Sequence, residues 1–215
     1  MKVLVTGSSK GIGRAICDKF LEEGYDVIGL DILPSTIYHR NYTHFVCDVS
    51  NAEELPDMCD IGILVNNAGV QNEQDSIKVN VLGAVNCCRK YANSKTKSVL
   101  NIVSVSAHNG AEFPLYTVSK GGLLAYTKNL AQSLAKYGTT VNSLSPGGVI
   151  TDINSHILNN ELLYDKVKKE TLLNKWATCE EIADWAFFFT AVNKSVTGQD
   201  LIIDNGEMSK FNFIW

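Results

Sequence analysis

The stretch "TGSSKGIG", residues 6–13, lies between two segments whose apolar residues are spaced differently. Before it, the short apolar run at 2–6 predicts a buried strand. After it, apolar side chains recur at intervals of three and four residues, which predicts a helix. The recurring positions are Ile12, Ala15, Ile16 and Phe20. Gly24 offers a left-handed cap at the end of this helix, so the stretch is the turn of a strand–turn–helix unit.

The glycines of this turn indicate a phosphate site. Gly7, Gly11 and Gly13 permit a tight turn and a close approach of the backbone to a ligand. The amides and the macrodipole at the start of the following helix favour a bound diphosphate. Asp31 ends the next apolar run (26–30), where a dinucleotide-binding fold places an acid. This context favours a dinucleotide site over a turn that binds nothing.

Further along the chain, short apolar runs alternate with segments of helical spacing. The expected strands are 2–6, 26–30, 43–47, 61–65, 98–104, 139–145 and 199–204. After the first helix, the expected helices are 75–93, 115–136, 157–171 and 179–191. Continuous apolar strands that alternate with helices are typical of a parallel sheet covered on both faces. We predict an α/β fold with a doubly wound (Rossmann) parallel seven-stranded sheet, as a single domain over residues 1–215.

Composition and charge exclude several classes of protein. The chain has 215 residues, of which 45% are hydrophobic and 20% charged, a balance typical of a globular domain. A net charge of -4 without a long basic cluster argues against nucleic-acid binding. No apolar run has the length of a signal peptide core or a membrane span, so we expect a cytoplasmic protein that does not enter a membrane. The six cysteines lack metal-binding spacing, so we expect no metal site.

The segment "YTVSK", residues 116–120, places a tyrosine four positions before a lysine within the expected helix 115–136. Residues four apart share a helix face, so Tyr116 and Lys120 can point into one site. A neighbouring ammonium would lower the pKa of the phenol. A phenol tuned toward neutral pH can act as a general acid–base. Lys120 could be a surface lysine, and Tyr116 could be an ordinary aromatic at a helix N-terminus. Either is common alone, but the two together in a chain that also has a phosphate turn are not.

The spacing of the first turn, G-x-x-x-G-x-G, resembles the TGxxxGIG turn of the short-chain dehydrogenase/reductase family. "NNAG" (66–69) resembles the motif after that family's fourth strand, and "YTVSK" resembles its YxxxK motif. "SPGGVITD" (145–152) is similar to its PG turn, and "VTGQDLIIDNG" (196–206) to its closing strand. Several motifs in the same order along almost the whole chain are more specific than any one of them.

The resemblance implies an NAD(P)(H)-dependent oxidoreductase that interconverts a secondary alcohol and a ketone by hydride transfer. Tyr116 would be the general acid/base, Lys120 would lower its pKa, and Ser104 would hold the substrate oxygen. Ser106 is the alternative serine, because residues two apart on a strand share one face. Asn80, within the expected helix 75–93, would support a water relay to the lysine.

The same resemblance implies the cofactor contacts. The residues expected to contact the cofactor are Gly7, Ser9, Lys10, Gly11, Ile12, Gly13, Asp31, Asp48, Val49, Asn67, Ala68, Gly69, Tyr116, Lys120, Pro146, Gly147, Val149 and Thr151. A carboxylate at Asp31 can accept hydrogen bonds from ribose hydroxyls and would repel a 2′-phosphate, which favours NAD. Lys10 favours NADP, whereas no basic residue follows Asp31. We expect NAD, with NADP less favoured, and keep a structural turn cap as the other role for Asp31.

Two segments are short for this family. Asp48 and Asn66 are only eighteen positions apart, and Pro56 interrupts them, so we expect a brief third crossover helix. Segment 70–79 is compressed before a helix that the family uses in subunit pairing. Its shortening would open the active-site mouth or alter the dimer surface. A homodimer or homotetramer remains the expected assembly.

The substrate side of the expected site is polar. The segment 152–175, an expected lid, and the segment before Tyr116 carry His108, Asn109, Asn154, His156, Asn159, Asn160 and Tyr164. These residues suggest a hydroxylated small-molecule substrate, although polar lid residues also face water. Two other functions stay open: a regulatory protein that binds NAD(H) without catalysis, and a sugar-nucleotide epimerase. An epimerase normally has a larger C-terminal domain than this chain provides.

Overall fold

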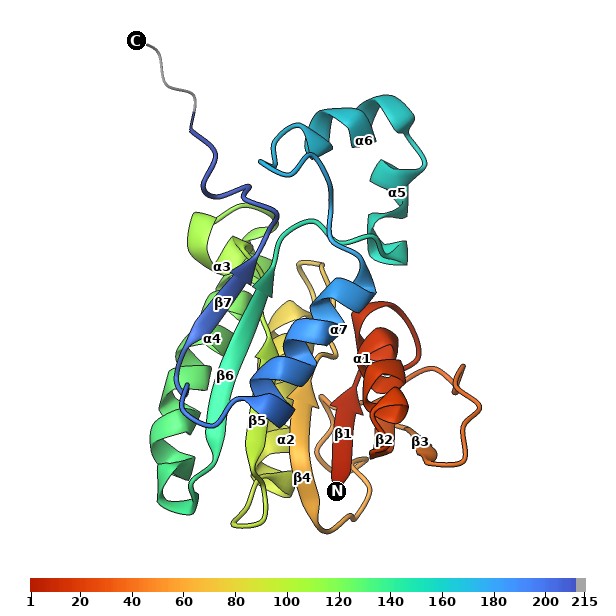
Figure 1. Ribbon diagram of the computed structural model, residues 1–215, viewed down its shortest axis with the longest axis vertical. Coiled ribbons are helices and arrows are strands. Elements are labelled where there is room, and N and C mark those ends of the chain that lie inside the picture. The colour runs from red at the N-terminus through yellow and green to blue at the C-terminus, as the bar shows by residue number, and fades with distance from the viewer. Residues whose placement is uncertain (212–215) are drawn as a thin grey trace.

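Seven parallel strands form the centre of the structure, in the order β3-β2-β1-β4-β5-β6-β7 (Figure 1). They are β1 (Lys2–Thr6), β2 (Asp26–Asp31), β3 (Tyr42–Val46), β4 (Ile61–Asn66), β5 (Ser98–Ile102), β6 (Thr140–Pro146) and β7 (Asp200–Ile203). The computed structural model describes residues 1–211. The strand order reverses between β1 and β4, the switch point at which open α/β sheets bind ligands. The predicted doubly wound seven-stranded sheet is confirmed.

Helices cover both faces of the sheet (Figure 1). On one face lie α1 (Gly11–Glu22) and α7 (Cys179–Phe187), which contact each other, and on the other lie α2 (Ala84–Tyr91) and α4 (Pro114–Leu134). Because side chains alternate along a strand, each strand contributes to two apolar layers. Within residues 1–211, no helix has the length and apolar character that crossing a membrane requires.

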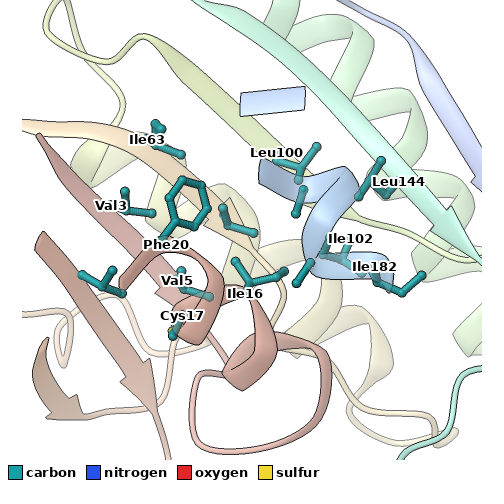
Figure 2. Close-up of a cluster of buried hydrophobic side chains, with 14 of the residues drawn as sticks. Val3, Val5, Ile16, Cys17, Phe20, Ile63, Leu100, Ile102, Leu144 and Ile182 are labelled. Atoms are coloured by element: carbon teal, nitrogen blue, oxygen red, sulfur yellow. The ribbon is translucent and has the colours of Figure 1, made fainter. Parts of the chain in front are cut away.

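The two apolar layers hold the helices to the sheet. Figure 2 shows the layer beneath α1 and α7, where Val3 and Val5 of β1 meet Ile16 and Phe20 of α1. All four side chains are fully buried. Burial of each contributes about 1.5–3 kcal/mol relative to exposure. The helical and strand periodicities in the sequence therefore fix how α1 lies on β1, and with it the turn at 6–13.

The chain between β3 and β4 differs from its prediction. Residues 50–55 form turns rather than the brief helix that the family resemblance implied, so that prediction is wrong. Asp48 accepts a hydrogen bond from the Ser50 amide (2.8 Å), and Glu54 accepts one from the Asp48 amide (2.9 Å). Polar side chains thus satisfy a compact loop, because too few residues separate the strands for a helix that could pack on the sheet.

Three other helical segments are divided. The expected helix 75–93 is a π-helical segment, η1 (Ile77–Gly83), followed by α2. The expected helix 157–171 is α5 (Ser155–Leu158) and α6 (Glu161–Lys168), separated where the Asn160 side chain caps α6. The expected helix 179–191 is α7 followed by the π-helical η4 (Phe188–Val192). Short 3-10 turns complete the described helices: η2 (Ala135–Tyr137) and η3 (Asp152–Asn154).

The end of β5 also differs from its prediction. The strand ends at Ile102, and Ser106 begins a short helix, α3 (Ser106–Asn109). The Val105 amide donates to the Pro146 carbonyl (3.0 Å). Helix α3 follows and is capped at its C-terminal end by Gly110, whose φ is +74°. Ser104 and Ser106 therefore do not share a strand face, and that expectation is wrong.

Candidate active site

The first turn is shaped by residues that lack a side chain. Gly7 and Gly11 have φ values of +68° and +55°, which other residues rarely adopt. A Cβ atom on Gly13 would lie 2.0 Å from the Gly7 carbonyl oxygen. Lys10, at the N-cap of α1, makes no side-chain hydrogen bond to the first amides of the helix. These amides and the helix dipole fit the phosphates of a dinucleotide.

A hydroxyl that the sequence analysis missed joins this turn to the end of β4. Thr6 Oγ1 accepts hydrogen bonds from the amides of Asn67 (3.0 Å) and Ala68 (2.9 Å). Asn67 Nδ2 donates back to the carbonyls of Thr6 (3.0 Å) and Gly7 (3.1 Å). Thr6 is a polar residue at the end of a buried strand, and this position is the feature of the sequence that could have identified it. Asn67 and Ala68 thus brace the two strand ends that flank the switch point.

Asp31 connects β2 to the first turn. Its carboxylate is buried and accepts hydrogen bonds from the amides of Ser9 and Leu33, both at 2.9 Å. These contacts are those of a structural turn cap, which the sequence analysis kept as the other role for Asp31. They also fix a negative charge beside the first turn. Lys10, which belongs to that turn, is exposed.

The loop after β3 meets η1. Val49 is buried, and a Cβ atom on Gly83 would lie 2.8 Å from its Cγ2 atom. Asn86 Nδ2 donates to the carbonyls of Val49 (3.1 Å) and Ser50 (3.3 Å). The segment that holds Asp48 and Val49 is therefore fixed against the helical segment that carries Asn80.

Helix α4 carries the tyrosine and the lysine. It begins at Pro114, whose fixed φ suits the first position of a helix, so Tyr116 lies in the first turn. Lys120 is buried one turn later and donates from Nζ to the Ile102 carbonyl at 2.9 Å. Its Nζ atom lies 5.7 Å from the centre of the Tyr116 ring. The helix therefore brings the two side chains together at the end of β5.

Burial shifts the pKa of both groups toward their neutral forms. Desolvation lowers the pKa of Lys120 to about 8. It also raises the pKa of the Tyr116 phenol, while a hydrogen bond with Ser104 acts in the opposite direction. The expected lowering of the phenol's pKa is therefore not produced by the protein alone, because burial dominates.

The structure distinguishes the two candidate serines. Ser104 lies close enough to Tyr116 to lower the pKa of the phenol, and its Oγ accepts a hydrogen bond from the Ser106 amide (3.2 Å). Ser106 is buried, and its hydroxyl has no hydrogen-bond partner within residues 1–211. Ser104, the serine favoured by the family resemblance, is thus the one that lies beside the phenol.

Asn80 occupies the π-helical segment, a distortion that is frequent at functional sites. Its Oδ1 accepts from the Val70 amide (2.8 Å), and its Nδ2 donates to the Val70 carbonyl (2.9 Å) and to Ser119 Oγ (2.9 Å). A Cβ atom on Gly69 would lie 3.1 Å from Asn80 Oδ1 and 3.6 Å from Lys120 Nζ. Asn80 therefore braces α4 and lies close to the buried lysine.

The segment after β6 faces the first turn. The Gly147 amide donates to the Ile203 carbonyl (2.9 Å), and Val149 is buried. Thr151 Cγ2 lies 3.6 Å from where a Cβ atom of Gly11 would be. A cavity of about 270 Å³ lies here, lined by Gly11, Arg14, Ala15, Asp18, Ile150, Thr151, Asp152, Cys179 and Glu180. A larger cavity of about 580 Å³ lies between α7 and β7. None of the predicted site residues lines it, so we do not assign the active site to it.

Several polar residues near the expected substrate pocket are used by the protein itself. Asn154 Nδ2 donates to the Val149 carbonyl (2.8 Å), and Asn160 caps α6. Asn109 accepts from the Ala111 amide (2.9 Å), and His108 pairs with Asp200 (2.9 Å). These four side chains therefore carry no argument for a hydroxylated substrate.

The sheet and the glycine turn at its switch point are those of a dinucleotide-binding fold, and a serine, a tyrosine and a lysine come together at the end of β5. Comparison with known proteins agrees. Residues 7–207 match the family described as enoyl-(acyl carrier protein) reductase. The chain belongs to the short-chain dehydrogenase/reductase family.

Relatives of known name cover nearly the whole chain. A 3-oxoacyl-(acyl-carrier-protein) reductase of Chlamydia pneumoniae is 30% identical, over 95% of this chain and 96% of its own length. The L-rhamnose 1-dehydrogenase (NADP(+)) of Thermoplasma acidophilum is 29% identical, over 94% of each chain. The structure of a putative gluconate dehydrogenase from Agrobacterium tumefaciens is 27% identical, with a TM-score of 0.88 over 98% of this chain and 96% of that one.

Proposed function

We propose that this oxidoreductase interconverts a secondary alcohol and a ketone at the corner formed by Ser104, Tyr116 and Lys120. The observation that supports this proposal is that Ser104 lies close enough to the Tyr116 phenol to lower its pKa, with Lys120 Nζ 5.7 Å from the centre of the same ring. Two adjacent hydroxyls can both contact one substrate oxygen.

A bound dinucleotide would supply or accept the hydride. Phosphates would lie on the amides at residues 9–13, and Thr151 would reach the carboxamide of the nicotinamide. Asp48 and Val49 would flank the adenine, while Asn67, Ala68 and Gly69 would line the ribose beside it. Pro146, Gly147 and Val149 would form the wall after β6. The three glycines of the first turn support this placement, since the tight turn needs the positive φ of Gly7 and Gly11 and has no room for a Cβ atom at Gly7 or Gly13.

We propose NAD as the favoured cofactor. One relative is named for NADP(+), so family membership leaves the choice to individual residues. The Asp31 carboxylate is anchored by two amides at the end of β2, and its negative charge opposes a 2′-phosphate. Lys10 acts the other way and is the reason to measure both cofactors.

The protein groups move one proton. Tyr116 takes the proton of the alcohol, or donates a proton to the carbonyl in the reverse direction, while Ser104 donates a hydrogen bond to the same substrate oxygen. Lys120, whose pKa is about 8, is charged at neutral pH. Its charge and that of the oxidised nicotinamide favour the phenolate against the opposing effect of burial. Asn80 holds α4 in place and supports a water relay that ends at Lys120.

The named relatives act on two kinds of substrate, acyl-carrier-bound ketones and sugars or sugar acids. A panel of alcohols and ketones from both kinds, followed by the absorbance of the reduced nicotinamide with NAD and with NADP, tests the activity. We expect turnover with a small-molecule alcohol or ketone. The other candidate, a regulatory protein that binds NAD(H) without catalysis, predicts binding of NADH but no turnover across the panel.

Replacing the phenol tests the mechanism. Tyr116→Phe should lower kcat at least about 1000-fold, because the proton acceptor is lost, with the Kd for NADH unchanged. Tyr137→Phe, at an exposed tyrosine beyond the end of α4, is the matched control and should keep full activity. A fully active Tyr116→Phe enzyme would contradict the proposed role.

We also propose that the protein is cytoplasmic and forms a homodimer or homotetramer. Exposed apolar side chains on α7 and η4, such as Trp185, Phe188 and Val192, support an assembly, because water-exposed apolar area favours association. Light scattering of the purified protein measures its mass directly, and a monomer at micromolar concentration would contradict this proposal.

A further inference from the structure

A row of polar side chains crosses four strands of the sheet beneath α4. Asn66 of β4 is the register partner of Asn101 on β5, which pairs with Ser143 on β6, which pairs with Asp200 on β7. Asn66, Asn101 and Ser143 are buried, and the Asp200 side chain is only 8% exposed. Burying polar groups in a sheet is unfavourable unless they are hydrogen-bonded. The hydrogen-bond partners of this row therefore show which elements it connects to the sheet.

One end of the row holds the catalytic helix. Asn66 Nδ2 donates to Asn101 Oδ1 (2.8 Å), and Asn101 Nδ2 donates to Thr127 Oγ1 on α4 (2.9 Å). The other end holds the turn that carries Ser104. Asp200 accepts from Ser143 Oγ through Oδ1 and from His108 Nε2 on α3 through Oδ2 (2.9 Å).

The proton on His108 can be assigned from its partner. An ionised Asp200 can only accept hydrogen bonds, so Nε2 must carry the proton. Ser145 Oγ lies 3.2 Å from the same nitrogen. A serine–histidine–aspartate triad uses both ring nitrogens, one for each partner, and this cluster uses Nε2 for both. The cluster is therefore a structural tie and not a nucleophile.

His108 and Ser104 belong to one tightly bonded turn. The Ala107 amide donates to the Ser104 carbonyl (3.0 Å), and the His108 amide donates to the Val105 carbonyl (2.8 Å). The Val105 amide donates to the Pro146 carbonyl (3.0 Å). With the His108 side chain fixed to β7, the turn is held at two points, and Ser104 lies between β5 and the anchored part.

We propose that His108, fixed by Asp200, is a positioning residue that holds Ser104 beside Tyr116. This inference rests on the proposed function of the same corner. The side chain of His108 does not touch the reacting atoms in this arrangement, and it acts through the backbone of residues 104–108. Displacement of a catalytic group by about 1 Å can cost about 100-fold in rate, so loss of the tie should be measurable.

The test removes and then restores the tie. His108→Leu should lower kcat about 10- to 100-fold with the Kd for NADH unchanged, because His108 is not one of the residues expected to contact the cofactor. His108→Gln, whose side-chain amide can donate to Asp200, should recover most of the activity. If His108→Leu does not fold, His108→Asn, which is too short to reach Asp200, replaces it.

Asn142→Ala is the matched control. Asn142 is also buried on β6 and ties it to the segment before β7, donating to the Val196 carbonyl (2.8 Å) and accepting from the Gln199 amide (3.1 Å). It should lower Tm as much as His108→Leu while leaving kcat intact. Equal losses of kcat in the two variants, or an unchanged kcat in His108→Leu, would overturn the proposal.

A readout without substrate separates this inference from the proposed function. The Ser104 hydrogen bond lowers the pKa of Tyr116, so His108→Leu should raise that pKa in a ¹³C-tyrosine NMR titration. The Tyr116 signal is assigned by its loss in Tyr116→Phe. An unmoved pKa overturns the positioning role whether or not a substrate is known. A moved pKa with a fully active Tyr116→Phe enzyme would instead refute the catalytic function and keep the structural tie.

Discussion

The first turn and the proposed catalytic corner depend on different parts of their residues. The turn at residues 7–13 depends on backbone amides and on side chains that are absent, as the 2.0 Å approach at Gly13 shows. The corner at residues 104–120 depends on side chains that are present: a hydroxyl, a phenol and a buried ammonium. Added atoms should therefore damage the first region, whereas removed atoms or charge should damage the second.

The largest effect is expected where an added methyl group meets backbone. In Gly13→Ala, the new Cβ atom would overlap the Gly7 carbonyl oxygen and lie 2.4 Å from Asn67 Nδ2, so the turn must open. We expect a loss of more than about 3 kcal/mol in the free energy of unfolding. We also expect at least a tenfold (~1.4 kcal/mol) weaker binding of NADH. Urea unfolding and calorimetric titration measure the two quantities.

Gly121→Ala is the control for the same substitution in the other region. Nothing lies within 4 Å of where its Cβ atom would be, and Gly121 is inside α4. Alanine should stabilise this helix by about 0.5–1 kcal/mol. If both glycine variants lost stability equally, the contrast between the two regions would be wrong.

The next effect is the removal of the buried charge. Lys120→Met should lower kcat at least about 100-fold, because Tyr116 loses the charge that favours its phenolate. The same variant should be more stable than the wild-type protein at pH 7, by about 1–2 kcal/mol, because a buried ammonium opposes folding. Steady-state kinetics and urea unfolding at pH 7 test the opposite signs of these two changes.

The pH dependence of stability tests whether the charge of Lys120 is the cause of the greater stability expected for Lys120→Met. The pKa of Lys120 is about 8 in the folded protein and about 10.4 in an unfolded chain. Between these values the unfolded state binds the additional proton, so this lysine makes stability rise with pH across that range. Below pH 8 the full penalty applies. The stability advantage of Lys120→Met should therefore shrink from pH 8 to about 10.4, and a constant difference would attribute it to packing.

The smallest effect is expected at Asp31, where backbone contacts and charge act together. Asp31→Asn keeps one acceptor oxygen for the amides of Ser9 and Leu33 and loses the negative charge. The ratio of kcat/KM for NAD to that for NADP should fall about tenfold, because repulsion of the 2′-phosphate disappears. Lys10→Ala should move the same ratio in the opposite direction. A ratio unchanged in both variants would limit Asp31 to its role as a turn cap.

The sequence predicted regions whose structure depends on local rules. The strand at 2–6, the glycine turn and the first helix follow from periodicity and backbone freedom, and all three were predicted correctly. The pairing of Tyr116 with Lys120 follows from helix geometry alone. The predictions failed where single hydrogen bonds, rather than helix or strand periodicity, decide the conformation. The end of β5 is set by the Pro146 carbonyl, and the loop at 50–55 is set by the carboxylates of Asp48 and Glu54.

By itself, the sequence determined the strands of the sheet, the glycine turn and the shared helix face of Tyr116 and Lys120, because short-range spacing encodes all of them. Only the tertiary structure decided how burial shifts the pKa of Tyr116 and Lys120, and it agrees with the family resemblance in placing Ser104 beside the phenol. It also created the row from Asn66 to Asp200, whose members are far apart in the chain. Strand register is a long-range property, so no local pattern could have shown that row.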